Sequence, residues 1–157
     1  IITSFESALN ACVILTSFIP MLSGTGGNSG SQSSVAVIRA LSLDEVEFSD
    51  VLAVLWKEIR VAVLCGVCLG GANFIKMMVV DRWLMHNPEV TPLVALVVCL
   101  TLMLTVVCAK IVGCTLPMAA EKVGIDPAVM AAPFITTIVD ALSLLIYFAI
   151  ATHVLGI

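Results

Sequence analysis

The chain has 157 residues, of which 61% are hydrophobic and only 11% are charged, and its mean hydropathy is +1.17. Soluble domains carry about 25% charged residues, so this composition indicates an integral membrane protein. The formal net charge of -4 and the lack of a basic patch exclude nucleic-acid binding. Because the chain begins at Ile1 without a basic leader, we expect no signal peptide and interpret it as part of a longer protein.

Four stretches are long and apolar enough to cross a bilayer, which takes about 20 residues. They cover approximately residues 8–41, 51–80, 90–118 and 128–155, and residues 1–7 read as the end of an earlier span. We therefore predict an all-α integral membrane fold with four complete transmembrane helices plus the end of a fifth at the N-terminus.

The first stretch contains a run of small polar residues from Ser23 to Ser34, SGTGGNSGSQSS. Glycine weakens a helix by about 1 kcal/mol relative to alanine, which favours an unwound or closely packed segment. Irregular backbone at membrane depth occurs only where protein buries it or where it lines a cavity, so a flexible linker is excluded. Two interpretations remain open: tight packing against other helices, or a polar path lined by backbone carbonyls and Asn28.

The second stretch contains two small-residue patterns. Gly66 and Gly70 are four residues apart, a spacing that lets membrane helices approach closely, so we expect helix packing and assign no partner. Cys65 and Cys68 form a CxxC motif, but a soft-metal site needs further convergent ligands, and no second CxxC or nearby His supplies them. We interpret both cysteines as packing residues and expect no disulfide framework.

Orientation follows from the basic residues, which gather on the cytoplasmic side of membrane proteins. The connections after the first and third stretches are predicted to be cytoplasmic because the following residues cluster there: Arg39, Lys57, Arg60, Lys110 and Lys122. The acidic tract 44–50 then lies inside the cell. The connection 81–89 lies outside, with Trp83 and His86 at the membrane interface.

Asp140 is the only charged residue within the fourth stretch. A charge at the centre of a membrane helix is disfavoured by roughly 2.5 to 3.5 kcal/mol on insertion scales and therefore faces a cavity, a partner or an ion path. Helical spacing places five residues on the side of Asp140: Pro133, Thr136, Thr137, Ser143 and Tyr147. The structural alternatives are a carboxylate tied to Lys110 or to another helix, or a protonated one.

The groups available near Asp140 are hard oxygen ligands, from Thr136, Thr137, Asn28 and backbone carbonyls, which suit Mg²⁺ or Ca²⁺ and disfavour copper or zinc. Magnesium retains its water and is bound by one or two carboxylates, so one Asp per chain suggests a symmetric pair from two chains. Asp126 precedes Pro127 and is sufficiently explained as a helix N-cap, which does not exclude contact with an ion.

Two other classes of function are disfavoured. An intramembrane enzyme would need a second catalytic group beside Asp140, and His153 is more than three helical turns away, so we predict that the chain is not an enzyme. A purely structural subunit would leave the buried carboxylate without a reason.

Two separated motifs resemble the MgtE family of bacterial magnesium channels. The first is PMLSGTGGNSGSQ at residues 20–32, followed by IRAL at 38–41. The second is GIDPA at 124–128, with PFITTIVD at 133–140 and LIYF at 145–148. The resemblance covers nearly the whole chain and implies that residues 1–157 form a single MgtE-type transmembrane domain, without the cytoplasmic sensor domains and most of the first span.

The resemblance also implies a homodimeric pore formed by the first complete span and the last span of both chains. Metal-binding roles fall on the Asp140 carboxylate, the Thr136 backbone carbonyl and Asp126 at the cytoplasmic entrance. Glu6 corresponds to an outer-vestibule glutamate, although a charge at an exposed terminus is also ordinary. The pore-lining positions that it implies are Gly24, Gly26, Gly27, Asn28, Pro133 and Thr137.

The function that follows is transport of Mg²⁺ across the bacterial inner membrane by a channel-like pore, with Mg²⁺ as both transported ion and ligand. The alternative is a secondary transporter that exchanges Mg²⁺ for Na⁺ or H⁺, because a broken first span is typical of such proteins. The expected partners are a second copy, membrane lipid and the cytoplasmic regulatory domains of the full-length chain.

Overall fold

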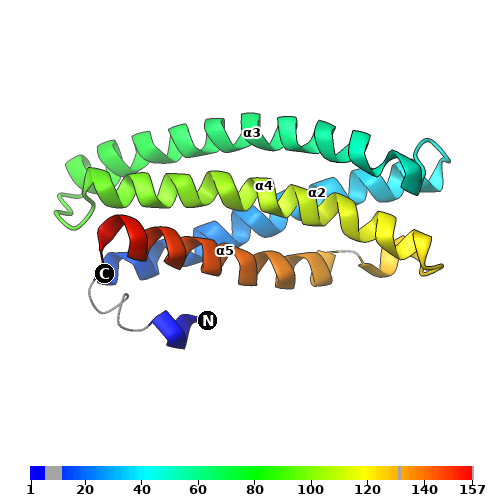
Figure 1. Cartoon of the computed structure of the whole chain (residues 1–157). Helices are drawn as coiled ribbons and strands as arrows, with labels where there is room; N and C mark the ends of the chain where they lie inside the picture. The colour runs from blue at the N-terminus through cyan, green and yellow to red at the C-terminus, as the bar shows by residue number, and fades with distance from the viewer. Residues whose placement is uncertain (6–11, 131, 157) are drawn as a thin grey trace.

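A computed structural model describes residues 1–5, 12–130 and 132–156, and this part of the chain is helical without any β-strand, as predicted. Four long helices run side by side (Figure 1), and short helical segments connect them. The long helices are α2 (Ile19–Ser42), α3 (Val51–Lys76), α4 (Pro92–Lys122) and α5 (Ala132–Leu155). The short segments are η1 (Ile2–Phe5), η2 (Val13–Phe18), η3 (Phe48–Asp50), the π-helix η4 (Met77–Leu84) and η5 (Pro127–Met130).

Three helical stretches of the described chain have the length and apolar composition of membrane spans: Phe48–Leu84, Pro92–Lys122 and Pro133–Leu155. They confirm the second, third and fourth predicted stretches, except that residues Pro127–Met130 form a separate 3-10 turn before α5. The 24 residues of α2 extend about 36 Å, which is long enough to cross a bilayer. Its Gly and Ser content lowers its hydropathy, so its role as a fourth span remains a prediction.

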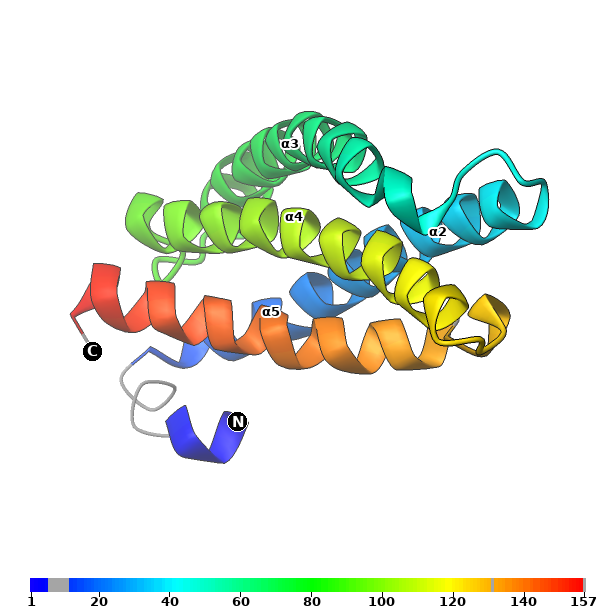
Figure 2. The same cartoon turned by 45° about the vertical axis from the view of Figure 1, so that its right-hand side comes forward.

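The helix α4 is the centre of the bundle and packs against each of the other three long helices. Figure 2 shows α4 between α3 on one side and α2 with α5 on the other. The 18-residue apolar window of α4 is 56% buried, whereas that of Phe48–Leu84 is 17% buried. The outer helix α3 therefore presents most of its apolar side chains to the surroundings.

A stripe of small residues fixes α3 to α4. A Cβ atom added to Gly66 would lie 3.3 Å from the Cα of Met103, and one added to Gly70 would lie 3.3 Å from the Met103 Cγ. Glu58, Ala62, Gly66 and Gly70 recur every four residues and are the buried positions of α3. The predicted packing role of Gly66 and Gly70 is confirmed, and the partner is α4.

The glycine tract of the first stretch lies inside α2, which is a continuous α-helix from Ile19 to Ser42. The prediction of an unwound segment is therefore wrong, and so is the broken first span that motivated the exchanger alternative. A helix satisfies its own backbone hydrogen bonds at membrane depth, and close packing of α2 against its neighbours compensates for the low helix propensity of glycine.

The contacts of the glycine tract confirm the tight-packing interpretation. An added Cβ on Gly26 would lie 2.6 Å from the Thr105 Cγ2, and one on Gly27 would lie 3.1 Å from the Thr136 Cγ2. The closest approach joins α2 to α4, where a Cβ on Gly113 would lie 2.2 Å from the Gly30 carbonyl oxygen. Side chains larger than hydrogen would force these helices apart.

Tyr147 connects α5 to the segment that precedes α2. Its side chain is completely buried, and its hydroxyl donates a hydrogen bond to the Leu15 carbonyl at 2.9 Å. Phe18, Leu22 and Phe148 belong to the same hydrophobic cluster. This end of the bundle is thus closed by apolar packing around one buried polar contact.

The Tyr147→Phe substitution should lower the free energy of unfolding by about 1 kcal/mol, because it removes the hydroxyl and leaves the Leu15 carbonyl without its donor. Unfolding of the purified protein in detergent would measure the change. Thr152→Val is the control, since within the described residues the Thr152 hydroxyl bonds only to carbonyls of its own helix. Equal losses in the two variants would contradict the special role of Tyr147.

Candidate functional site

Asp140 lies on α5 where this helix meets α2. The preceding residue, Val139, is buried and contacts the position of Gly26, whereas Asp140 is partly exposed. One turn further along, the Ser143 hydroxyl donates to the Asp140 backbone carbonyl at 2.9 Å and lies 3.4 Å from the Ser23 hydroxyl of α2. The carboxylate is therefore placed at the edge of the contact between the two helices.

The Asp140 carboxylate forms no hydrogen bond or ion pair within the described residues. The alternative in which Lys110 neutralises it is wrong, because the Lys110 ammonium lies 3.1 Å from both the Glu58 carboxylate and the Ser33 hydroxyl. Asp140 thus keeps its carboxylate oxygens available to a ligand.

Thr136, one turn before Asp140, is half-buried against Gly27. The hydroxyls of Thr136 and Thr137 both donate to the Pro133 carbonyl, at 3.1 Å and 2.8 Å. Pro133 and Thr137 are exposed and border a hollow of about 270 Å³. Thr137 is therefore fully accessible, whereas Thr136 and Asp140 are accessible only in part.

The predicted polar stripe does not form a single face. Ser143 and Tyr147 are completely buried, and Tyr147 is used in the contact with Leu15. Thr137 is exposed and Thr136 is half-buried. The stripe is divided because Ser143 lies against Ser23 of α2 and Tyr147 bonds to the segment before α2, whereas Thr137 lies outside these contacts.

The exposed side of α2 carries the remaining polar residues of the glycine tract. Gly24 and Asn28 are exposed, and no described atom lies within 4 Å of a Cβ added to Gly24. Gly26 and Gly27 are instead buried in the contacts with α4 and α5. A groove of about 530 Å³ continues along the same side and is lined by Asn28, Ser31, Gln32, Val35, Ala36 and Arg39.

Asp126 and Asp140 lie in different parts of the structure. Asp126 is exposed in the connection between α4 and α5, and its carboxylate accepts a hydrogen bond from the Ala128 backbone N–H at 2.9 Å. The predicted N-cap role is confirmed, with η5 as the helical turn that it caps. Glu6, the predicted vestibule residue, lies outside the described residues.

The described part of the chain contains no group of three or more His, Cys, Asp or Glu side chains that could hold a metal ion. Cys65 and Cys68 are free thiols. Within the described residues of one chain, a cation bound at Asp140 would therefore meet a single carboxylate, together with backbone carbonyls, hydroxyls and water.

One buried polar cluster was not predicted. Glu58 of α3, Lys110 of α4 and Ser33 of α2 are at most 8% exposed and form hydrogen bonds with one another. Lys110 therefore lies inside the bundle and not at the cytoplasmic connection to which its charge was assigned. The sequence signal that could have indicated this cluster is that Glu58 and Lys110 carry opposite charges and each lies inside an apolar stretch. Their contact, however, depends on how the helices pack.

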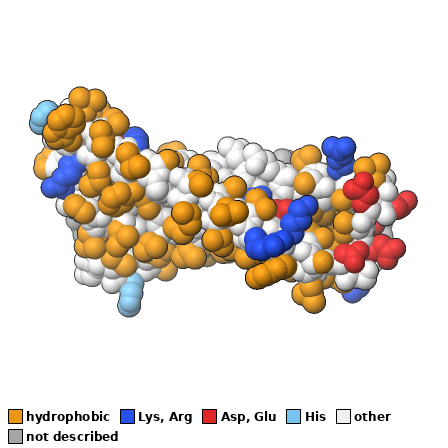
Figure 3. Space-filling model, turned by 90° about the horizontal axis from the view of Figure 1, so that it is seen from above, with side chains coloured by type: hydrophobic (Ala, Val, Ile, Leu, Met, Phe, Trp, Pro, Cys, Tyr) orange, Lys and Arg blue, Asp and Glu red, His pale blue; other side chains and the backbone are white. Residues whose placement is uncertain are grey.

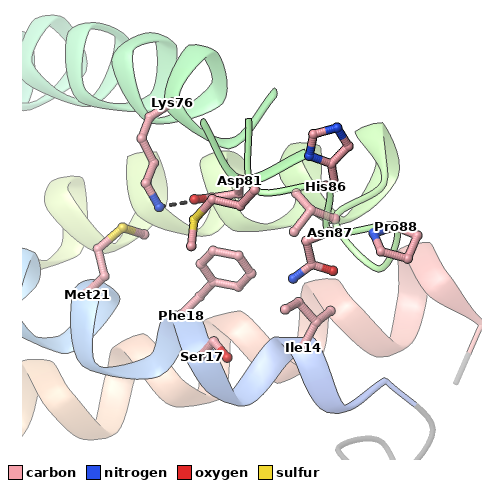
Figure 4. A pocket seen from close by; sticks show the side chains of 11 residues that line it. Ile14, Ser17, Phe18, Met21, Lys76, Asp81, His86, Asn87 and Pro88 are labelled. Carbon is pink, nitrogen blue, oxygen red and sulfur yellow. Dashed lines mark hydrogen bonds and ion pairs between the residues drawn. The ribbon is translucent and has the colours of Figure 1, made fainter. Parts of the chain in front are cut away.

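A cavity of about 700 Å³ lies between η2 with the start of α2 and the connection that follows η4 (Figure 4). The Lys76 ammonium and the Asp81 carboxylate pair at 2.7 Å on one side of it. Their spacing of five residues matches the i to i+5 repeat of the π-helix that begins at Met77. Neither Asp140 nor Thr136 lines this cavity.

The acidic side chains gather at the end of the molecule that carries the connection between α2 and α3, while apolar side chains cover its flanks (Figure 3). Together with the long apolar helices and the accessible Asp140, this distribution defines a multi-pass membrane protein with a polar site between two helices. Residues 19–150 match the family model for MgtE, described as a divalent cation transporter. The chain belongs to the MgtE family.

Three curated relatives are similar over almost the whole chain, and each is named magnesium transporter MgtE. The protein of Bacillus subtilis is 38% identical over 153 residues, that of Thermus thermophilus 37% over 151 residues, and that of Enterococcus faecalis 34% over 152 residues. These matches cover 96–97% of the chain but 32% of each relative. The chain thus spans about a third of the length of these relatives, whose names are those of transporters and not of enzymes.

Proposed function

We propose that this chain forms the path for Mg²⁺ across the bacterial inner membrane, as a channel-like pore built from two copies. The observation that carries the proposal is the Asp140 carboxylate, which lies accessible at the contact of α2 with α5 and has no partner within the described residues. Relatives that are 34–38% identical to the chain over the 151–153 aligned residues are named magnesium transporters.

The chemistry of the site suits a hydrated divalent cation. Magnesium gives up its water reluctantly and is held by one or two carboxylates plus water. Two Asp140 side chains would supply two negative charges, and the carbonyl of Thr136 and the amide of Asn28 would contact bound water. Gly24, Thr137 and Pro133 are exposed on the same two helices and would line the path.

The exposed side of α2 supports a second copy as the partner. Residues spaced by three or four positions form an exposed stripe on this helix: Pro20, Gly24, Asn28, Gln32, Val35 and Arg39. Polar side chains at membrane depth are costly in contact with lipid and normally face a bundle interior or a water-filled cavity. In a dimer this stripe would face the partner and the path, whereas the apolar surface of α3 would face lipid.

Cysteine cross-linking between copies tests the dimer. Val35 on α2 and Leu64 on α3 are similarly exposed, at 66% and 68%, so they form a matched pair. In a background without native cysteines, Val35→Cys should give disulfide-linked dimers in membranes, and Leu64→Cys should not, because only α2 faces the partner. Dimers through Leu64→Cys alone would assign the interface to α3 and contradict the proposal.

Transport itself is tested with the protein in liposomes that contain a Mg²⁺-sensitive dye. A channel should admit Mg²⁺ in response to membrane potential alone, since moving each charge through 100 mV is worth about 2.3 kcal/mol and Mg²⁺ carries two. Unitary currents in planar bilayers would support the channel. Uptake that strictly requires a Na⁺ or H⁺ gradient would support exchange. That alternative was based on a broken helix, whereas α2 is continuous.

Cytoplasmic regulatory domains remain part of the proposal through the family resemblance. The connection between α2 and α3 carries Asp44, Glu45, Glu47 and Asp50 and is predicted to face the cytoplasm. Domains on that side would lie next to this acidic surface, at the same end of the bundle as the connection between α4 and α5 (Figure 1).

A further inference from the structure

Three buried side chains connect three different helices. The Lys110 ammonium of α4 donates to the Glu58 carboxylate of α3 at 3.1 Å and to the Ser33 hydroxyl of α2 at 3.1 Å. The Ser33 hydroxyl in turn donates to the same oxygen of Glu58. Lys110, Glu58 and Ser33 are 7%, 8% and 1% exposed. We refer to Ser33, Glu58 and Lys110 as the buried triad.

The triad lies inside the helix bundle and away from the end of α4. Lys110 is twelve residues before the end of α4 at Lys122, which corresponds to about 18 Å along the helix. Buried charges are tolerated when they are paired and hydrogen-bonded, and removing one partner is strongly destabilising. Ser33 is the member through which α2 joins the charged pair.

The triad adjoins the closest contact between α2 and α4. Gly30, one turn before Ser33, is the residue whose carbonyl lies against Gly113 of α4. On the α5 side, a Cβ on Gly30 would meet Ile135 at 2.8 Å and Val139 at 3.5 Å, and Val139 immediately precedes Asp140. The part of α2 that the triad holds against α3 and α4 is therefore also the part that packs against α5 next to Asp140.

We propose that Ser33, Glu58 and Lys110 are positioning residues that hold α2 against α3 and α4, and thereby set the spacing of α2 from α5 at Asp140. This inference rests on the proposed function in one respect, namely that the contact between α2 and α5 borders the Mg²⁺ path. Ser33 has a special place because its hydroxyl takes part in both triad hydrogen bonds that reach α2, whereas Glu58 and Lys110 still pair without it.

The chain offers a matched control in the next residue. Ser33 and Ser34 are both 1% exposed on α2, but the Ser34 hydroxyl has no hydrogen-bond partner within the described residues. Ser33→Ala removes the link to the triad, and Ser34→Ala removes an equally buried hydroxyl that makes no such link. Both variants keep the Glu58–Lys110 pair, so both are expected to fold, which a thermal unfolding transition in detergent would verify.

The spacing of α2 from α5 can be read at Ser23 and Ser143, whose hydroxyls are 3.4 Å apart. In an otherwise unchanged background that lacks the native cysteines, the double variant Ser23→Cys with Ser143→Cys should form an intramolecular disulfide rapidly. Adding Ser33→Ala should slow its formation by about two- to thirtyfold, the range expected for coupling of 0.5–2 kcal/mol. Adding Ser34→Ala should leave the rate unchanged, and Ser33→Thr, which retains the hydroxyl, should recover most of it.

Mg²⁺ uptake into liposomes by the single variants, without the added cysteines, provides the second measurement. Ser33→Ala should shift the Mg²⁺ concentration that gives half-maximal uptake, whereas a loss of folded protein alone would lower only the maximal rate. Equal cross-linking rates and equal uptake curves for Ser33→Ala and Ser34→Ala would overturn the positioning role. If Asp140→Asn transports normally, the proposed path fails, and the cross-linking rates still decide whether the triad positions α2.

Discussion

Liposomes that contain the Asp140→Asn protein will take up Mg²⁺ at least about tenfold more slowly than those with the unmodified protein. A hydrated ion lies about 5 Å from a carboxylate that contacts its water shell, and at that distance a divalent and a monovalent charge attract by about 1.7 kcal/mol even at the dielectric constant of water. About 1.4 kcal/mol corresponds to a factor of ten. Asparagine keeps the shape of the side chain and removes this attraction.

The control for this substitution is Glu121→Gln, which also removes one negative charge but lies exposed near the end of α4. Its uptake should match that of the unmodified protein at moderate ionic strength, because exposed charges are screened beyond about 10 Å. Size-exclusion chromatography should show that both variants assemble alike. Undiminished Mg²⁺ uptake by Asp140→Asn would remove Asp140 from the path.

The Gly113→Ala substitution will lower the free energy of unfolding by about 3 kcal/mol or more. The new methyl group would lie 2.2 Å from the Gly30 carbonyl oxygen, which belongs to the backbone of a different helix and cannot rotate away. Overpacking of a core typically costs 1–3 kcal/mol, and here relief requires separation of α2 from α4. Detergent unfolding of the purified protein, followed by circular dichroism, would measure the loss.

Gly71→Ala on α3 is the matched control for the glycine contact. Apart from the adjoining backbone of its own helix, no described atom lies within 4 Å of the added Cβ at this position, and alanine is favoured over glycine in helices by up to about 1 kcal/mol. The stability of Gly71→Ala should be unchanged or slightly higher. A similar loss of stability at Gly71 and Gly113 would show that backbone effects, and not the contact between α2 and α4, determine the cost.

The features that could be predicted from the sequence are those determined by nearby residues or by the cost of placing a charge in the membrane. The length of the apolar stretches determined three of the helices, the Asp126–Pro127 pair predicted an N-cap, and the spacing of Gly66 and Gly70 predicted a helix contact. Asp140 stood out because a charge within an apolar helix is costly wherever that helix packs. Each of these arguments uses neighbours in the sequence or a property of the membrane.

The features that could not be predicted depend on which helices meet. Ser33 and Lys110 are separated by 77 residues, and no local pattern brings them together with Glu58. The conformation of the glycine tract also depended on α4 and α5, since close packing compensates for glycine only where a neighbour approaches. The stripe around Asp140 was divided because Tyr147 turns to Leu15, a contact with a segment that lies 132 residues away.

The outer helix α3 also has a consequence for the lipid around the protein. Trp56 and Trp83 are 63% and 74% exposed on this helix and its π-helical continuation, and about 40 Å of helix separates them. This separation matches the 40–45 Å between the two headgroup layers of a bilayer, where tryptophan is enriched. Between Arg60 and Lys76, however, the uncharged segment is only about 22 Å long, shorter than the 30 Å hydrocarbon core. Annular lipid beside α3 must therefore thin, or these two basic side chains must snorkel to the headgroups, to accommodate the mismatch.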